Sequence, residues 1–587
     1  MFFRNHRFTD FNIAKTSFLF SFVTLSLLTT SLLAQEKVRS DQRLPPGVLL
    51  YSSTPDIPGT YEAFKNTSYG QLINGPELEE FRVQLIEKFE AEASDGIQKI
   101  EEELGMPLSD LVALFAGDAS FAVLRPIGAP LGVVAMMEYG DHDDILGKLL
   151  SRLEAEIEKG TELVKSTEEY AGTEISVFTI ETEHPDYQTV DISYFRKDGH
   201  LVVASSLSLV ESVLDRWDGK NEQTFANDEL YAAILEQCAT TDGSTPDMVT
   251  FFNPIGLATA GLGLVPQAKP FVNLVPLYLP TLGLNRLKAT GSAMEVDAED
   301  FNLISKSMVY VERPATGMLK MFELRPTLTG PPTWVPADAT QYFGLDWNIA
   351  GAYEAVESVY DGFLGPGSFN RQITDLTRQA NQENLHIKKD IIDVLSGKME
   401  GFMIQEIEAL GPEPELDLKF AASIGVTDED KAWKLIEAAM KTTDDVEEQQ
   451  VRGNRVIVFS SPDGKEISLT IQGKQIFIAS SAEGLSNTIA GKSDGPALID
   501  SADYKQAKAH LPEQMSMLSY QSPATQLRAP YEALRNGEFD SAVEGDFDFS
   551  VLPPFEKIEK YFTPSFGYLM PVEKGAFSVQ FGLKPQE

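Results

Sequence analysis

An internal repeat constrains this chain more than any other feature, because two segments of similar pattern follow one another along its 587 residues. The first begins Leu44-Pro45-Pro46-Gly47-Val48-Leu49-Leu50-Tyr51, and the second begins Val335-Pro336-Ala337-Asp338-Ala339-Thr340-Gln341-Tyr342. Each continues into a helix signal that contains Tyr-Glu-Ala, at 61–63 and at 353–355. The chain is also too long for one compact core. We therefore predict two homologous units in tandem.

The pattern within each unit favours antiparallel sheet. Short apolar runs such as Val133-Val134-Ala135-Met136-Met137 predict strands, and other runs have the helical period of an amphipathic helix. Short turns such as Lys197-Asp198-Gly199 and Gln472-Gly473-Lys474 join consecutive strands. Short helices are also predicted from Asp110 to Gly117 and from Asp390 to Gly397, with Asp as N-cap and Gly after the end. We predict an α+β fold, with helices packed on one side of each sheet.

The domain boundaries follow from the repeat and from residues that break secondary structure. Residues 326–332 contain three prolines and a glycine, which is typical of a joint between domains. We assign the first α+β unit to 35–325, the linker to 326–332 and the second α+β unit to 333–587.

Residues 1–34 have the pattern of a secretory signal peptide. Arg4, Arg7 and Lys15 are basic, the run 17–33 is apolar apart from Ser and Thr, and Ala34 offers a small residue for cleavage. An uncleaved anchor helix is the alternative, which the hydroxyl side chains in the run weaken. We expect export to the periplasm or secretion, with no integral membrane span after cleavage.

Composition excludes some partners and one kind of covalent bond. The chain has 48 Lys+Arg and 88 Asp+Glu, a net charge of −40. That balance opposes binding to nucleic acid and docking on anionic lipid. Cys238 is the only cysteine, so no intramolecular disulfide forms, and we expect it to be a buried, unreactive side chain.

Histidines and acidic clusters lack the spacing of a metal or catalytic site. The histidines after the signal are His142, His184, His200, His386 and His510. No two have the spacing that places two imidazoles on one helix face, and we expect surface or turn positions for all of them. The cluster at 141–144, Asp-His-Asp-Asp, resembles a ligand set. The second unit has Thr-Asp-Glu-Asp at 427–430, so helix capping explains both and a weak divalent site explains only one.

Serines that follow strands have a structural explanation. Ala204-Ser205-Ser206 lies between a predicted strand and a helix, but the G-x-S-x-G elbow of a nucleophilic serine is absent. Capping-box spacing joins Ser208 to Glu211 and Ser480 to Glu483. Phosphate-binding glycine loops are absent too. We name no catalytic, cofactor-binding or metal-binding residue and expect no cofactor.

The stretch 253–285 has two interpretations. It contains one charge, Lys269, and five prolines, which break a spanning helix. We favour a buried connector between sheets or units, since long apolar runs are usually core. The alternative is an exposed apolar surface for a lipid, a membrane or a partner protein.

Several motifs resemble a known family. They are Leu44-Pro45-Pro46-Gly47, the helix start from Tyr69-Gly70-Gln71-Leu72 to Pro76-Glu77-Leu78, and Ser109-Asp110-Leu111 with Gly117. Together they resemble an uncharacterised family of exported bacterial proteins, a domain of unknown function associated with planctomycetes. The resemblance covers most of the chain after the signal. It implies export and supplies no catalytic residue.

Three hypotheses of function follow. The first is an exported, non-enzymatic protein with a binding or structural role, whose partner is unknown. The second is an extracytoplasmic hydrolase that uses an unplaced carboxylate pair. The third is a carrier or chaperone for apolar ligands that uses the stretch 253–285. An envelope protein or an apolar ligand is the kind of partner expected.

Overall fold

A computed structural model gives the structure of the chain. It describes residues 37–585 apart from 89–100, 102–103, 127–130, 161–162, 185–186, 266, 269–271, 380–384, 409–414, 441–445, 461–465, 494 and 538–547. The predicted signal peptide lies outside these residues. Within the described part of the chain, no helix combines the length and the apolar character needed to cross a membrane.

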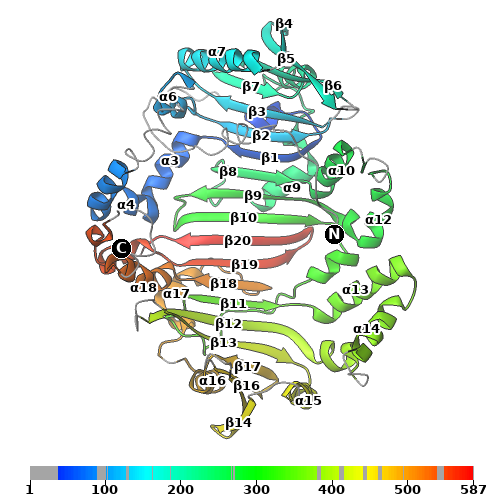
Figure 1. Ribbon diagram of the computed structural model, residues 1–587, viewed down its shortest axis with the longest axis vertical. Coiled ribbons are helices and arrows are strands. Elements are labelled where there is room, and N and C mark those ends of the chain that lie inside the picture. The colour runs from blue at the N-terminus through cyan, green and yellow to red at the C-terminus, as the bar shows by residue number, and fades with distance from the viewer. Residues whose placement is uncertain are drawn as a thin grey trace.

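One antiparallel sheet of twenty strands organises the molecule (Figure 1). The strands before residue 326 are β1 (Val48–Thr54), β2 (Ala119–Leu124), β3 (Gly132–Glu138), β4 (Leu163–Tyr170), β5 (Thr173–His184), β6 (Tyr187–Lys197), β7 (His200–Ala204), β8 (Met248–Phe252), β9 (Leu287–Val296) and β10 (Phe301–Val311). Those after it are β11 (Gln341–Asp346), β12 (Leu395–Glu408), β13 (Glu415–Val426), β14 (Val446–Val451), β15 (Asn454–Ser460), β16 (Glu466–Gln472), β17 (Gln475–Ala479), β18 (Met517–Gln521), β19 (Ser565–Val572) and β20 (Gly575–Leu583).

The pairing order of the strands is the same in both halves of the sheet. In the first half it runs β4-β5-β6-β7-β3-β2-β1-β8-β9-β10. In the second half it runs β14-β15-β16-β17-β13-β12-β11-β18-β19-β20. β10 and β20 pair through nine residue pairs and join the halves into one sheet. The predicted α+β class and antiparallel pairing are confirmed.

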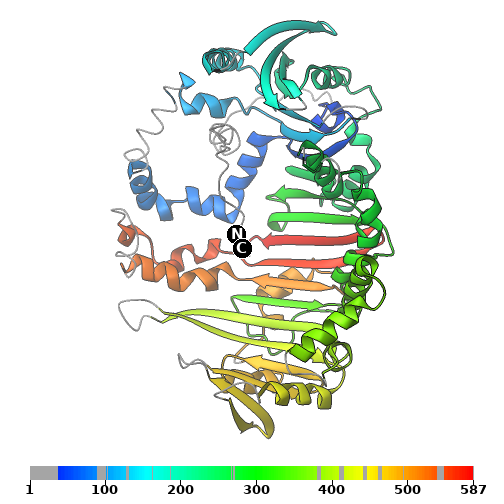
Figure 2. The same cartoon turned by 45° about the vertical axis from the view of Figure 1, so that its right-hand side comes forward.

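The sheet is curved, and helices cover its convex face (Figure 2). They include α8 (Leu207–Leu214), α9 (Glu229–Gln237), α16 (Ala482–Ile489) and α17 (Ala502–Lys508). In β9, Gly291 lies so close to α9 that an added Cβ would come within 2.9 Å of a methyl group of Ile234. Ala289 and Ala293 are buried on the same side. Because side chains alternate along a strand, Thr290 and Ser292 face the concave side.

Two rows of helices line the ends of the strands, one on each rim (Figures 1 and 2). One row holds α3 (Ile57–Asn66), α4 (Ser68–Asn74), α18 (Pro523–Arg535) and α19 (Phe555–Ile558). The other holds α10 (Pro254–Leu264), α12 (Val275–Leu282), α13 (Ile349–Leu364) and α14 (Ser368–Gln379). Each row contains helices from both halves. At the first rim, Leu72 of α4 clusters with Phe555 and Ile558 of α19. At the second, the rings of Tyr278 and Phe363 stack at 5.7 Å.

Further helices lie outside these rows: α2 (Ser40–Arg43), α6 (Leu108–Ala113), α7 (Asp143–Gly160) and α15 (Glu429–Met440). The predicted cap at Asp110 is wrong, because α6 begins after Pro107, whose φ is already suited to a helix start. Its counterpart is a π-helix, Ile387–Ile392, in which the carboxylate of Asp390 accepts a hydrogen bond from the N–H of His386 at 2.8 Å.

Candidate functional site

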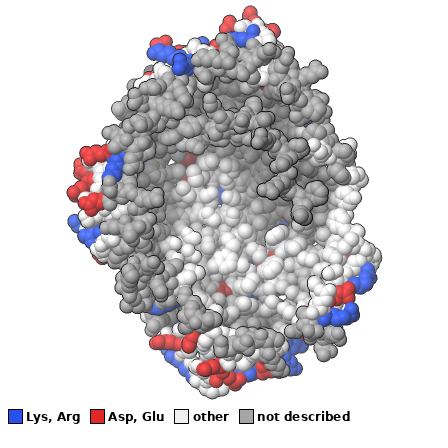
Figure 3. Space-filling view, viewed as in Figure 1, with Lys and Arg blue, Asp and Glu red and all other residues white. Residues whose placement is uncertain are grey.

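The concave face of the sheet forms a wide hollow. Figure 3 looks into this hollow, and the described atoms on its floor are mainly white, so few of them belong to acidic or basic residues. This floor is the side of the sheet opposite α9. Its residues come from strands of both halves, and the seam between β10 and β20 runs through its middle (Figure 1).

One row of side chains crosses the floor from strand to strand, and we call it the concave row. Its members are Phe121, Ser52, Thr250, Ser292, Ser307, Ser578, Leu569, Met517, Leu345 and Met399, each paired with the next. All ten are partly exposed and none is charged. The hydroxyl oxygens of Thr250 and Ser292 lie 2.7 Å apart and share a hydrogen bond. The row therefore combines hydroxyl groups at its centre with apolar side chains toward both ends.

Larger apolar side chains flank the concave row on the same face. Val133, Leu303, Val309 and Phe343 are each between 36% and 44% exposed. A cation occurs near the start of β9, where Lys288 pairs with Glu312 at 3.3 Å and is thereby neutralised. A surface of this composition suits an uncharged ligand, because a charged one would lose hydration without gaining an opposite charge.

A smaller polar cavity lies on the convex side of the first half. Its volume is about 270 Å³, and residues of β1, α9 and the segment 39–41 line it. Arg39 donates two hydrogen bonds to the carboxylate of Asp41, at 3.1 and 2.9 Å, and the hydroxyl of Tyr231 donates a third at 3.2 Å. The hydroxyls of Ser40 and Tyr51 lie 2.8 Å apart. The residues that follow the predicted signal thus close over this cavity.

Asp118 is the one lining carboxylate of this cavity that has an unpartnered oxygen among the described atoms. It is 7% exposed, and its Oδ1 has no hydrogen-bond partner. Burial raises the pKa of Asp118 to about 6. Burial also works to raise the pKa of Glu138, but hydrogen bonds from Lys37 and from the N–H of Asp118 outweigh it and lower that pKa. Glu138 does not line the cavity. Asp118 and Glu138 therefore do not share this cavity. The second carboxylate that lines it is Asp41, whose charge is compensated by Arg39 and Tyr231.

Sequence reasoning missed these residues, although the repeat contains a signal for two of them. Tyr51 and Tyr342 lie within the two opening strands, β1 and β11, and both are buried. Tyr231 and Tyr504 each come three residues after a helix N-cap, and they are buried as well. In the second half, Tyr342 donates a hydrogen bond to Glu400 at 3.3 Å.

The histidines do not come together. His200 is buried, its Nδ1 donates a hydrogen bond to the carbonyl of Asp198 at 2.8 Å, and its ring packs edge-on against Trp217. His200 thus directly follows the turn at 198–199, in agreement with a turn position, but it is buried rather than on the surface because its ring packs against the indole. His510 lies 3.4 Å from a carboxylate oxygen of Asp300. The side chain of His184 lies outside the described part of the structure, and no described group of three His, Cys, Asp or Glu residues could hold a metal ion.

The serines that follow strands, and Asp143 of the acidic cluster, take part in hydrogen bonds and helix caps that stabilise the fold. The hydroxyl of Ser205 accepts from the N–H of Val133 at 2.9 Å, and that of Ser480 accepts from Phe420 at 3.1 Å. These bonds are equivalent in the two halves. The predicted N-caps, Ser208 and Ser480, are wrong by two residues and one residue, since the N-caps are Ser206 and Ser481. Helix α7 begins at Asp143, which accepts a hydrogen bond from Tyr139 at 2.9 Å.

Cys238 is fully buried in the main core, as predicted, and burial raises the pKa of its thiol to about 12. It lies at the end of α9, against β9, and borders the polar cavity. A thiol with so high a pKa is not ionised at neutral pH, so it is a poor nucleophile.

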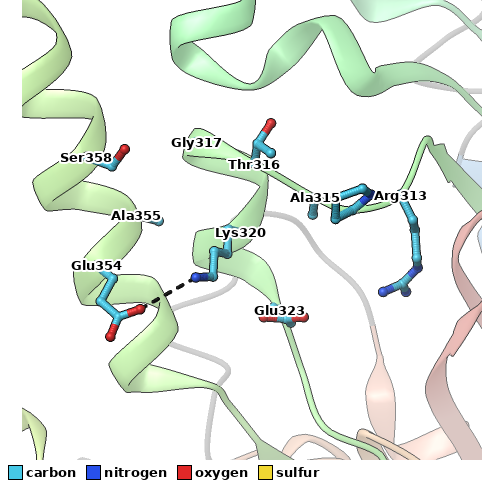
Figure 4. Close-up of a pocket in the computed structure, with 10 residues that line it drawn as sticks. Arg313, Ala315, Thr316, Gly317, Lys320, Glu323, Glu354, Ala355 and Ser358 are labelled. Atoms are coloured by element: carbon cyan, nitrogen blue, oxygen red, sulfur yellow. Dashed lines mark ion pairs between the residues drawn. The ribbon is translucent and has the colours of Figure 1, made fainter.

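Another cavity, of about 740 Å³, lies between α13 and the 3₁₀ helix η5 (Gly317–Phe322), as Figure 4 shows. Its charged groups already have partners. Lys320 pairs with Glu354 at 3.6 Å, and Glu323 accepts a hydrogen bond from Asn348 at 2.9 Å. Arg313 donates to the carbonyl of Gly575 at 2.9 Å. These contacts join residues near the linker to the second half and leave little free charge for a ligand.

The stretch 253–285 is not a buried connector, so the interpretation favoured from the sequence is wrong. In α10 only Ala260 is buried, and in α12 no residue is. Leu277 is 69% exposed and Tyr278 is 48% exposed. Pro254 fits at the start of α10 and Pro276 in the first turn of α12, and these two short helices lie on the rim in the described part of the stretch.

The fold defines this molecule as an α+β protein built on one open, curved, antiparallel sheet. A family model described as "Protein of unknown function (DUF3352)" matches residues 115–522. That match covers more than half of the chain, so the chain belongs to this family. No curated protein and no solved structure matches it.

Proposed function

We propose that this is an exported, non-enzymatic protein that binds an uncharged, elongated ligand along the concave face of its sheet. Export rests on the signal pattern of residues 1–34 and on the resemblance to exported bacterial proteins. The observation that carries the binding function is the concave row, ten uncharged and partly exposed side chains in register across ten strands.

The repeated strand order supports a second part of this proposal, that the two halves arose by tandem duplication. Each of the strands β1 to β10 corresponds to the strand whose number is ten higher, and the two have equivalent neighbours in the sheet. Duplication explains why the concave row continues through both halves. It also explains why the ligand would be long, because a site built from two copies doubles the length of one.

The test is to place a charge on the floor of the hollow and to measure binding of an uncharged fluorophore, phenylnaphthylamine. Ser307→Glu and, separately, Ser578→Glu should weaken binding at least about tenfold, equivalent to about 1.4 kcal/mol, since the new carboxylate must keep its water. Ser166→Glu on the exposed strand β4 is the matched control and should bind like the wild type. Binding unchanged in the Ser307 and Ser578 variants would contradict the proposal.

A carrier for apolar ligands is the second candidate function. The observation that favours it is the exposure of the apolar residues between 254 and 282. Native mass spectrometry of protein from its own envelope fraction separates the two candidates. A bound lipid favours the carrier, and a bound uncharged saccharide or peptide favours the first proposal. A broad hydrolase screen tests the enzymatic alternative, which requires activity that Asp118→Asn or another single substitution abolishes.

A further inference from the structure

One rim of the molecule carries large apolar side chains that protrude into solvent. We define the apolar rim by Leu264 of α10, Leu277 and Tyr278 of α12, Phe322 of η5, and Phe363 and Leu364 of α13. Their exposed fractions run from 42% to 75%. The right-hand edge of Figure 3 shows a stretch of white surface where α10 and α12 lie, with blue and red atoms below it toward α13 and α14.

The rim residues of α12, η5 and α13 form one continuous surface, although they come from both halves of the chain. The rings of Tyr278 and Phe363 stack at 5.7 Å. Beside them, an added Cβ on Gly362 would come within 2.9 Å of the methyl group of Thr281, so α12 and α13 are in close contact. Phe322 ends η5, which packs along α13.

Such exposure is unusual for helices of so apolar a sequence. A helix that is apolar all round its circumference is normally buried in a core or a membrane. Helix α10 has this character, with the sequence Pro-Ile-Gly-Leu-Ala-Thr-Ala-Gly-Leu-Gly-Leu, yet only Ala260 is buried. Exposed apolar patches of this kind mark surfaces for proteins or membranes.

We propose that the apolar rim docks on the surface of a neutral, zwitterionic lipid membrane. The side chains that reach furthest, Leu277, Phe322 and Leu364, are 69%, 75% and 62% exposed, so they protrude rather than line a groove. Protruding apolar side chains can enter the interface of a bilayer, where apolar faces of helices and Tyr rings are stable. A groove would instead indicate a peptide partner.

Charge separates this partner from the alternatives. The described residues of α10 and α12 include no charged side chain, whereas the whole chain has a net charge of −40. On η5 and α13 the rim does carry charges, of which Lys320 and Glu354 pair with each other at 3.6 Å. A second copy of the same chain would be repelled at long range, and so would an anionic membrane. A zwitterionic surface has no net charge to oppose the approach.

The experiment is flotation of the mature protein with phosphatidylcholine vesicles. The wild type should float with the vesicles, and the double variant Leu277→Asp/Phe322→Asp should lose at least about tenfold in partitioning. The matched control is Val164→Asp/Ile467→Asp, which places the same charges on exposed apolar residues of β4 and β16 and should bind like the wild type. Adding anionic lipid should weaken binding at low ionic strength, and salt should restore it.

Three results would overturn this inference. They are no flotation of the wild type, equal loss in the control variant, or a dimer in sedimentation that the rim variant dissociates. Circular dichroism confirms that each variant is folded, which the exposure of all four residues predicts. Binding of phenylnaphthylamine by the rim variant should be unchanged, so failure here is distinct from failure of the concave-face proposal.

Discussion

At the scale of single residues, two buried aspartates in the same cavity differ in how they are held. Asp41 accepts hydrogen bonds from Arg39 and Tyr231, so its charge is compensated. Asp118 keeps an unpartnered oxygen, and its pKa lies near 6. The sequence could not separate them, because both stand near serines and neither belongs to a spaced motif. Only the fold brings the segment 39–41 against β1 and α9.

Substitution of these two aspartates should therefore shift stability in opposite directions. The folded-state pKa of Asp118 is above the unfolded value, so its protonated form favours folding at low pH, and that contribution is lost as the pH rises through about 6. The rise of about two units corresponds to at most about 3 kcal/mol. Asp118→Asn should raise the free energy of unfolding at pH 8 by about 1–3 kcal/mol and change little at pH 4.

Asp41→Asn should change the free energy of unfolding in the opposite direction. It should lower the free energy of unfolding at pH 8 by about 1–3 kcal/mol, because Arg39 and Tyr231 lose a charged acceptor. Urea unfolding of both variants and the wild type at pH 4, 6 and 8 measures the effect. The prediction is contradicted if Asp118→Asn destabilises the protein at pH 8 as much as Asp41→Asn does. That result would show that hydrogen bonds or opposite charges stabilise the Asp118 carboxylate in the folded state.

At the scale of elements, the helices on the rims hold the two halves together. Phe555 of α19 is fully buried, and it clusters with Leu72 of α4, which lies 483 residues earlier in the chain. Nearby, Glu77 accepts hydrogen bonds from Lys560 at 3.0 Å and from Tyr561 at 3.1 Å. The sequence motif from Tyr69 to Leu78 predicted a helix start on one side of this contact, but contacts this far apart in the chain have no local signal.

The small apolar cluster around Phe555 should contribute strongly to the free energy of unfolding. Phe555→Ala removes a ring from a closed cluster and should lower the free energy of unfolding by about 3–5 kcal/mol. The same substitution at Phe322, which is 75% exposed, should change it by less than about 0.5 kcal/mol. Thermal unfolding of the two variants compares them directly. Equal effects would mean that the cluster around Leu72 does not form.

At the scale of the whole molecule, the sequence predicted the parts better than their assembly. Short apolar runs predicted the strands β2 and β3, and the structure gives each of them one face buried on the core. The seam between β10 and β20 could not be predicted, since either edge strand of a half has the same alternating pattern. The burial of the stretch 253–285 was predicted wrongly for a related reason. Its apolar composition shows that exposure to water is unfavourable, but it does not show whether another element covers the segment.

The seam has a thermodynamic consequence that separates one folding unit from two. β10 and β20 share nine residue pairs, and one core cluster contains Leu124 of the first half and Phe566 of the second. The two halves should therefore unfold together. In Trp217→Phe, the remaining tryptophans, Trp334, Trp347 and Trp433, all lie in the second half and report on it alone. Their fluorescence and the far-ultraviolet circular dichroism of the whole chain should give one coincident urea transition. Two separate midpoints would instead mean that the halves are independent domains joined by a weak seam.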